Sequence, residues 1–156
     1  MRGVGQRTAW RPDPGKDTEP VARILIVEEH ILVRRLLWQI LTDAGHEIVG
    51  EAEDGPAGVG RLDDLTPELV MYGISSSGES EVATIRRMLM IEPSLPILLC
   101  AGAAHQEQAR DAVRHGARGF LVKPFSRDAV LSAVRHSLRP PAVLHEAVRG
   151  RGHYSR

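Results

Sequence analysis

Two adjacent carboxylates and one lysine are the residues whose types and positions suggest shared chemistry. Glu28 and Glu29 directly follow an apolar run at 24–27, and Lys123 directly follows another at 120–122. Lys123 is conspicuous because 18 of the 20 basic residues are arginines and the only other lysine lies near the N-terminus. If both runs are strands of one parallel sheet, their carboxyl ends share an edge, and the carboxylates would meet the ammonium group there.

The elements that must position these residues alternate between strands and helices. Short, continuous apolar runs are typical of strands buried on both faces, and apolar residues at helical spacing follow each run. Five strands joined by crossover helices form a parallel sheet with both faces covered. The sequence therefore predicts an α/β, doubly wound (βα)5 flavodoxin-like fold with a five-stranded parallel sheet. We expect strands at 24–27, 47–52, 69–72, 97–100 and 120–122, and helices over 32–44, 56–65, 82–89, 109–113 and 127–138.

Length and charge favour one folded domain between two arms. The 156 residues carry 20 basic and 20 acidic side chains, so the formal net charge is zero, which gives no support for a bulk binder of nucleic acid. We expect a flexible arm at 1–21, a domain at 22–138 and a basic, disordered tail at 139–156. Residues 21–138 hold twelve basic against sixteen acidic side chains, so the neutral total hides an acidic domain.

Several classes of protein are disfavoured by what the sequence contains. Cys100 is the only cysteine and cannot form an internal disulfide, and no apolar run approaches the roughly 20 residues that span a bilayer. We therefore expect a cytoplasmic protein without membrane contact. The seven histidines show no paired metal-ligand spacing, and no glycine-rich phosphate-binding loop follows the first strand.

Residues 23–138 resemble the receiver domain of response regulators, the phospho-accepting module of two-component signalling. The resemblance covers the whole predicted fold, and the segments that carry it are 23–30, 45–52 and 116–125. It implies an acidic pair after strand one that holds Mg²⁺ and an aspartate ending strand three that accepts the phosphoryl group. It also implies a hydroxyl residue ending strand four and a lysine after strand five, both of which bind phosphoryl oxygens.

Two of these implied side chains are missing. Gly73 stands at the phospho-acceptor position and has no side chain to act as nucleophile, and Ala101 stands at the hydroxyl position. Lys123 matches the pocket lysine, with an ion pair to Glu28 or Glu29 at the surface as the alternative role. Phe120 falls at the family's switch-aromatic position, where we expect an inward ring; a purely structural core residue would give the same ring position.

The acidic pocket is present in altered form as Glu28 and Glu29. Each is one methylene longer than the family's aspartates, and Mg²⁺ requires near-ideal octahedral geometry. We expect no cofactor, with Mg²⁺ on Glu28 and Glu29 as the alternative and a solvated acidic turn as a further reading. The loop 75–80 also departs from the family's turn, and a serine there lacks an evident base.

These residues predict a degenerate receiver domain, or pseudo-receiver, that is not an enzyme and acts through protein–protein interaction without aspartyl phosphorylation. The expected contact surface is the face of the fourth helix, fifth strand and fifth helix, which would bind a histidine kinase or output protein, or a second copy. This face includes His105, Arg110, Arg114, Arg118, Arg127 and Arg135. No DNA-binding domain is expected in the chain. The alternatives are a conventional receiver with a non-standard acceptor and a flavodoxin-like ligand-binding protein.

Overall fold

The computed structural model describes residues 20–75 and 81–139, so most of the two expected arms lies outside the described residues. Strands and helices alternate along the described chain, with one 3-10 turn, η1, before the fourth helix. The elements are β1 (Arg23–Val27), α1 (Ile31–Asp43), β2 (Glu47–Ala52), α2 (Gly55–Leu65), β3 (Leu69–Gly73), α3 (Glu81–Ile91), β4 (Ile97–Ala101), η1 (Ala103–His105), α4 (Gln106–Arg114), β5 (Gly119–Val122) and α5 (Arg127–Leu138).

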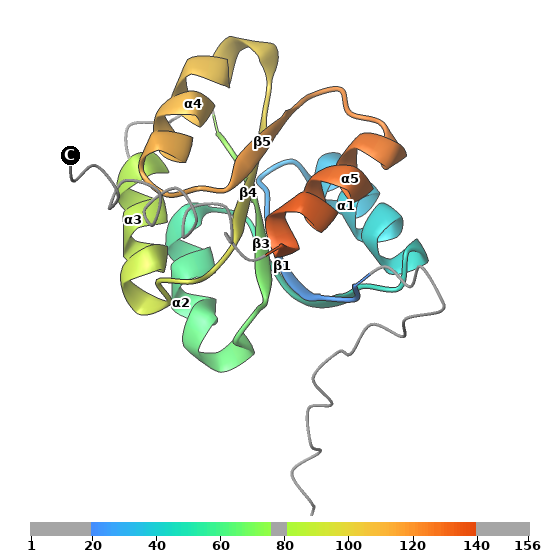
Figure 1. Ribbon diagram of the computed structural model, residues 1–156, viewed down its shortest axis with the longest axis horizontal. Coiled ribbons are helices and arrows are strands. Elements are labelled where there is room, and N and C mark those ends of the chain that lie inside the picture. Colours follow the sequence, from blue (N-terminus) through green and yellow to red (C-terminus); the bar gives the residue numbers. More distant parts are fainter. Residues whose placement is uncertain (1–19, 76–80, 140–156) are drawn as a thin grey trace, which may run out of the picture.

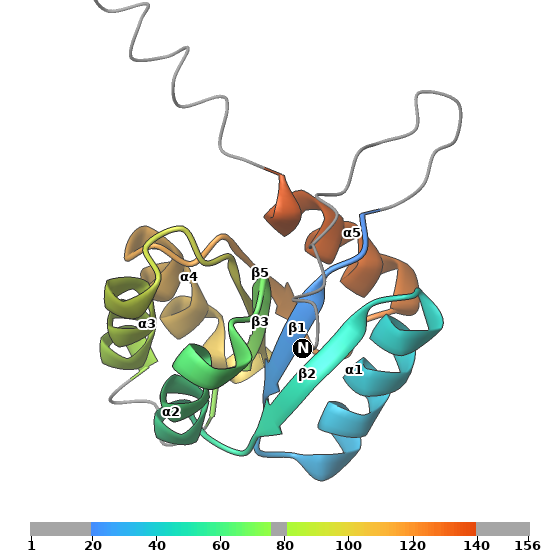
Figure 2. The ribbon, with the colours of Figure 1, turned by 90° about the horizontal axis from the view of Figure 1, so that it is seen from below.

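Two layers of helices enclose a five-stranded parallel sheet of strand order β2-β1-β3-β4-β5. Helices α1 and α5 cover one face, and α2, α3 and α4 cover the other (Figure 1, Figure 2). Side chains alternate between the two faces along β1, as the pleat requires. Leu25 and Val27 join the core under α2–α4, whereas Ile24 and Ile26 join the core under α1 and α5.

The predicted α/β fold is confirmed, including all five strands and all five helices. The differences lie at element ends. Every strand except β2 is one residue longer than predicted, so that β3 ends at Gly73 and β4 at Ala101; α3 and α4 are also longer, and η1 precedes α4. Ser126 accepts a hydrogen bond from the Ala129 N–H, as expected of the residue that caps α5. Within the described residues, no helix is both long and apolar enough to cross a membrane.

Gly58 in α2 has a packing role that the sequence does not reveal. Gly58 and Gly60, both inside this helix, lower its intrinsic helix propensity by up to ~1 kcal/mol each. A β-carbon built on Gly58 would lie only 2.7 Å from Val27 Cγ2, whereas one on Gly60 would meet nothing within 4 Å. Gly58 therefore lets α2 approach β1 closely, and the propensity cost is offset by that contact.

Arg118 ties the end of α5 to the segment before β4. Its Nη1 donates to the carbonyls of Ser137 and Arg139, each at 2.9 Å, and its Nη2 donates to the Ser94 carbonyl at 3.4 Å. The sequence places Arg118 in the expected partner-binding face, but its guanidinium satisfies backbone carbonyls at the amino-terminal edge of the sheet. Arg118 is therefore a structural residue.

We predict that Arg118→Ala lowers the free energy of unfolding by about 1–2 kcal/mol, because carbonyls at the end of α5 lose a charged donor. The measurement is urea unfolding followed by circular dichroism. Arg114→Ala is the matched control, since Arg114 is exposed on α4, and it should change stability by less than about 0.5 kcal/mol. Equal losses for the two variants would contradict the structural role of Arg118.

Candidate functional site

The carboxyl ends of four strands converge at one edge of the sheet and bring the chemically interesting residues together. The central pairings place Val27 beside Tyr72 and Gly73 beside Cys100. Lys123 follows β5, and its N–H donates to the Ala101 carbonyl at 2.8 Å, which holds the start of the β5–α5 loop against the end of β4. The strand order reverses between β2-β1 and β3-β4-β5, so this edge is the topological switch point where ligands bind in open α/β sheets.

Glu28 is buried at this edge and pairs with Lys123. Its relative exposure is 2%, and Lys123 Nζ lies 3.3 Å from Oε1 and 3.4 Å from Oε2. The His30 N–H also donates to Glu28 Oε1, at 3.2 Å. The ion pair that the sequence offered as an alternative therefore forms, but it is not the surface pair expected there, because one partner is fully enclosed.

Glu29 lies beside His30 instead of Lys123. Its side chain is 42% exposed and lies 3.7 Å from His30 Nε2. His30 occupies the N-cap position of α1 but makes no capping hydrogen bond with its side chain. The two adjacent carboxylates thus have different environments, and only Glu28 shares a site with Lys123.

Gly73 ends β3 directly beside the Glu28 carboxylate, and the three atoms nearest to where its β-carbon would stand all belong to that carboxylate. Ala101 is completely buried at the end of β4. Phe120 is partly buried and packs against the core under α2–α4, to which Ala101 also belongs. The structure therefore brings Glu28, Gly73, Ala101 and Lys123 to one end of the sheet, whereas Phe120 lies within β5 and pairs with Leu99 of β4.

Residues 24–135 match the response regulator receiver domain family. The chain is 32% identical over 112 residues to the chemotaxis protein CheY of Thermotoga maritima, covering 72% of this chain and 93% of that protein. It is 33% identical over 116 residues to CheY of Bacillus subtilis, covering 74% and 97%. The crystal structure of the NtrX receiver domain from Brucella abortus superposes with a TM-score of 0.67 at 30% identity, covering 74% of this chain and 97% of that one.

This chain belongs to the response regulator receiver family. It is a receiver domain of two-component signalling, the module that works with histidine kinases or output domains. The resemblance expected from segments 23–30, 45–52 and 116–125 is confirmed over nearly the whole predicted domain.

The acidic residues of this receiver domain do not fit the Mg²⁺ ion that the family binds. The Glu28 carboxylate is enclosed and paired with an ammonium group, and Glu29 turns toward His30. Octahedral coordination needs several oxygens around one point. Among residues 20–75 and 81–139, no group of three or more His, Cys, Asp or Glu side chains is arranged to hold a metal ion.

Arg34 holds the backbone of the site in place, and nothing in the sequence pattern indicates this role. Its Nη1 donates to the backbone carbonyl of Glu28 at 2.7 Å, and its Nε lies 3.7 Å from Glu51 Oε1. The residue lies near the start of α1 beside a second arginine, Arg35, so only the fold shows that it reaches back to the end of β1. Arg34 therefore helps to fix the backbone at Glu28.

Ser75, the described serine of the altered loop, is a structural residue. Its N–H and Oγ donate to Glu81 Oε1 at 3.1 Å and 3.0 Å, and Glu81 is buried at the start of α3. Ser76 and Ser77 lie outside the described residues. Sequence reasoning did not find Glu81, because a carboxylate at a helix start is ordinarily exposed.

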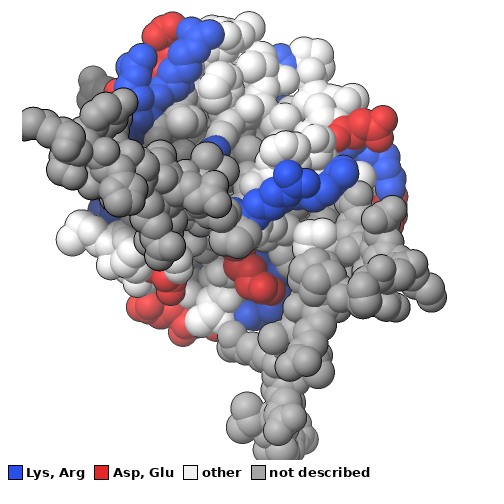
Figure 3. All heavy atoms as spheres, in the orientation of Figure 1, with Lys and Arg blue, Asp and Glu red and all other residues white. Residues whose placement is uncertain are grey.

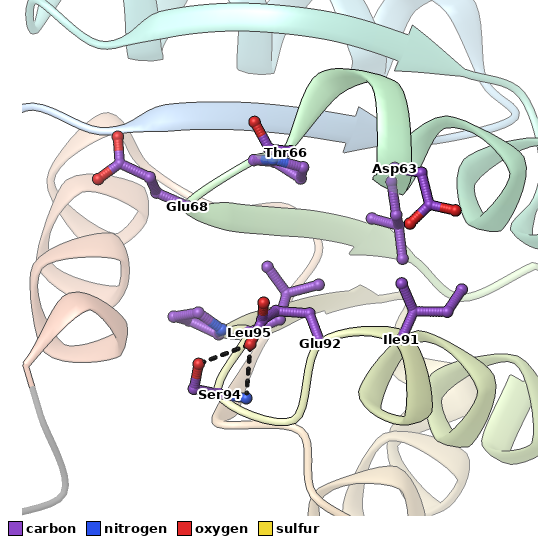
Figure 4. Close-up of a pocket in the computed structure, with 10 residues that line it drawn as sticks. Asp63, Thr66, Glu68, Ile91, Glu92, Ser94 and Leu95 are labelled. Atoms are coloured by element: carbon purple, nitrogen blue, oxygen red, sulfur yellow. Dashed lines mark hydrogen bonds between the residues drawn. The ribbon is translucent and has the colours of Figure 1, made fainter. Parts of the chain in front are cut away.

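A separate cavity of about 380 Å³ lies at the opposite end of the sheet (Figure 4). It is bounded by the end of α2, the start of β3 and the loop between α3 and β4. Glu92 in its wall accepts hydrogen bonds from the N–H and Oγ of Ser94, at 3.3 Å and 2.8 Å. Glu68 there accepts from the Arg23 N–H at 3.2 Å, so it cannot replace an acceptor at the carboxyl edge.

We predict that Lys123→Met lowers the free energy of unfolding by about 3 kcal/mol, because the enclosed Glu28 carboxylate loses its counter-charge. Urea unfolding measures the loss. The control is Arg127→Met, which removes an exposed ion pair with Asp43 whose side chains are 52% and 46% exposed, and which should cost less than about 1 kcal/mol. A loss below 1 kcal/mol for Lys123→Met would show that the pair is not structurally important.

Cys100 gives a prediction for alkaline pH. Burial, and then the charge of Glu28, raises the pKa of its thiol from 9.0 to about 12. Above pH 9 the unfolded chain loses this proton while the folded chain keeps it, so the thiol's contribution to stability falls as pH rises toward 12. Urea unfolding between pH 7 and pH 10.5 should therefore show a steeper decline for the wild type than for Cys100→Ala. Parallel pH profiles would contradict this assignment.

Proposed function

We propose that this receiver domain is a pseudo-receiver, which passes information through protein–protein contacts without forming an aspartyl phosphate. The observation that carries the proposal is Gly73 at the end of β3, where the family's phospho-acceptor stands. A glycine offers no nucleophile, and the neighbouring carboxylate, Glu28, is enclosed and paired with Lys123.

Ala101 and Lys123 support the same proposal. The family's hydroxyl residue at the end of β4 senses the phosphoryl group, but Ala101 is fully buried and has no hydroxyl to donate. Lys123 already has an anionic partner within the domain, so its charge is compensated without a phosphoryl group. No step of phosphoryl transfer is left for these residues to perform, and we propose that the domain is not an enzyme.

The proposed contact surface is the face of α4, β5 and α5, where a histidine kinase, an output protein or a second copy would bind. Arg110 on α4 pairs with Glu107, and Arg127 on α5 pairs with Asp43 of α1. In Figure 3, basic and acidic side chains are interspersed over the visible face of the molecule. A surface of this kind fits a partner that is recognised by shape and by local charge pairing. We expect the protein to act in the cytoplasm.

The test is incubation of the full chain with acetyl phosphate and Mg²⁺, followed at once by intact-mass measurement. We expect an unchanged mass, because no acceptor carboxylate is available. A receiver domain that retains its acceptor aspartate, treated in parallel, is the positive control and should gain one phosphoryl group. The same gain in this chain would overturn the proposal and favour a conventional receiver with a non-standard acceptor.

A further inference from the structure

We infer that Glu28 and Gly73 compensate for each other: the carboxylate of Glu28, the residue that follows β1, fills the place that the acceptor side chain at the end of β3 has in the family. The inference rests on the proposed pseudo-receiver function, because it identifies the residue that closes the site. Glu28 thereby acts as the determinant of the site's chemistry, excluding a carboxylate at position 73 and supplying the anion that Lys123 needs.

The space beside Gly73 is already occupied by Glu28. A β-carbon built on Gly73 would overlap Glu28 Oε2 and would stand 2.7 Å from Glu28 Cδ and 3.4 Å from Oε1. Contacts below 3.0 Å are essentially never made by real β-carbons, so any side chain at this position requires the carboxylate to move. The collision involves one residue only, since Glu28 supplies all three nearest atoms.

Backbone conformation does not explain the glycine. Among the described glycines, positive φ angles occur at Gly45 and Gly116, where helices end, and Gly73 is not one of them. Gly73 lies within β3 and pairs with Cys100 of β4 in regular parallel register. An L-residue could adopt this strand backbone, so lack of room is the reason that only glycine fits here.

Glu28 is held in this place from several sides. Its N–H donates to the Ala52 carbonyl at 2.9 Å, and its carbonyl accepts from Arg34 Nη1 at 2.7 Å, so the backbone is fixed. Its carboxylate accepts from Lys123 and from the His30 N–H. Moving it aside would break a buried ion pair, which is costly when one charge is left uncompensated.

The length of the Glu28 side chain is what makes this arrangement possible. An aspartate at this position is shorter by one carbon–carbon bond, about 1.5 Å, and its carboxylate would be drawn back from Gly73. The extra methylene of Glu28 therefore carries its carboxylate into the space that is free because Gly73 has no side chain. Restoring Gly73→Asp with Ala101→Thr alone would leave Glu28 in the way.

A double-mutant cycle on folding stability tests this coupling. The full chain is compared with Gly73→Ala, Glu28→Asp and the pair together, and thermal unfolding is followed by circular dichroism. We expect Gly73→Ala to lower the Tm by at least about 4 °C, the effect of overpacking a partly buried site against an enclosed carboxylate in a domain of this size. In the Glu28→Asp background the same substitution should lower the Tm by less than half as much.

Glu29→Asp supplies the matched control, because it shortens the neighbouring carboxylate, which is 42% exposed and supplies none of the three atoms nearest to a β-carbon at Gly73. In that background Gly73→Ala should cost as much as in the wild type. If Gly73→Ala alone does not fold, recovery of a folded protein by Glu28→Asp but not by Glu29→Asp supports the inference.

Two results would overturn the inference. One is a Tm loss for Gly73→Ala that is the same in all three backgrounds, and the other is no loss in the wild type. The cycle measures stability and needs no phosphoryl donor, whereas failure of the pseudo-receiver proposal would appear as a mass gain of the wild-type chain. The two failures are therefore distinguishable.

Discussion

The burial of one carboxylate, Glu28, constrains the whole carboxyl edge of the sheet. An ionised group at 2% exposure must be compensated, because removal from water without a partner costs several kcal/mol. Its partner, Lys123, lies 95 residues away along the chain and comes from the far side of β3 and β4. The pair therefore depends on the assembly of β1, β3, β4 and β5, and it links the first strand of the domain to the last.

The pairing of Glu28 with Lys123 also explains why the loop after β5 keeps a defined position. Lys123 is bound at both ends, through its backbone N–H to Ala101 and through Nζ to Glu28. In a phospho-accepting relative, this lysine binds a group that comes and goes. Here its anionic partner is part of the chain, so Lys123 has a counter-charge without an external ligand.

The fold was predictable from sequence because its strands are buried on both faces, and such strands read as uninterrupted apolar runs. The meeting of Lys123 with an acidic residue was also predictable, since parallel strands end at one edge. The sequence could not tell whether Lys123 meets Glu28 or Glu29. Adjacent residues at a strand end point in different directions, and only the packing decides which of them is enclosed. The glycine at the expected acceptor position was visible in the sequence. The place of the Glu28 carboxylate beside it was not, because the two residues stand at the ends of different strands and only the fold brings them together.

Loss of an acceptor aspartate alone would leave a poorly packed site with a lysine lacking its anion. Both defects carry a cost, since a small cavity forfeits packing contacts and a partly buried ammonium group loses its counter-charge. A glutamate at position 28 removes both at once, because its extra methylene fills space beside Gly73 and brings its carboxylate to Lys123. The same step makes the change hard to reverse, since a new side chain at 73 now meets an occupied site. If the domain is the proposed pseudo-receiver, its site is thus a stable repacking of the family's phosphorylation site around an internal ion pair.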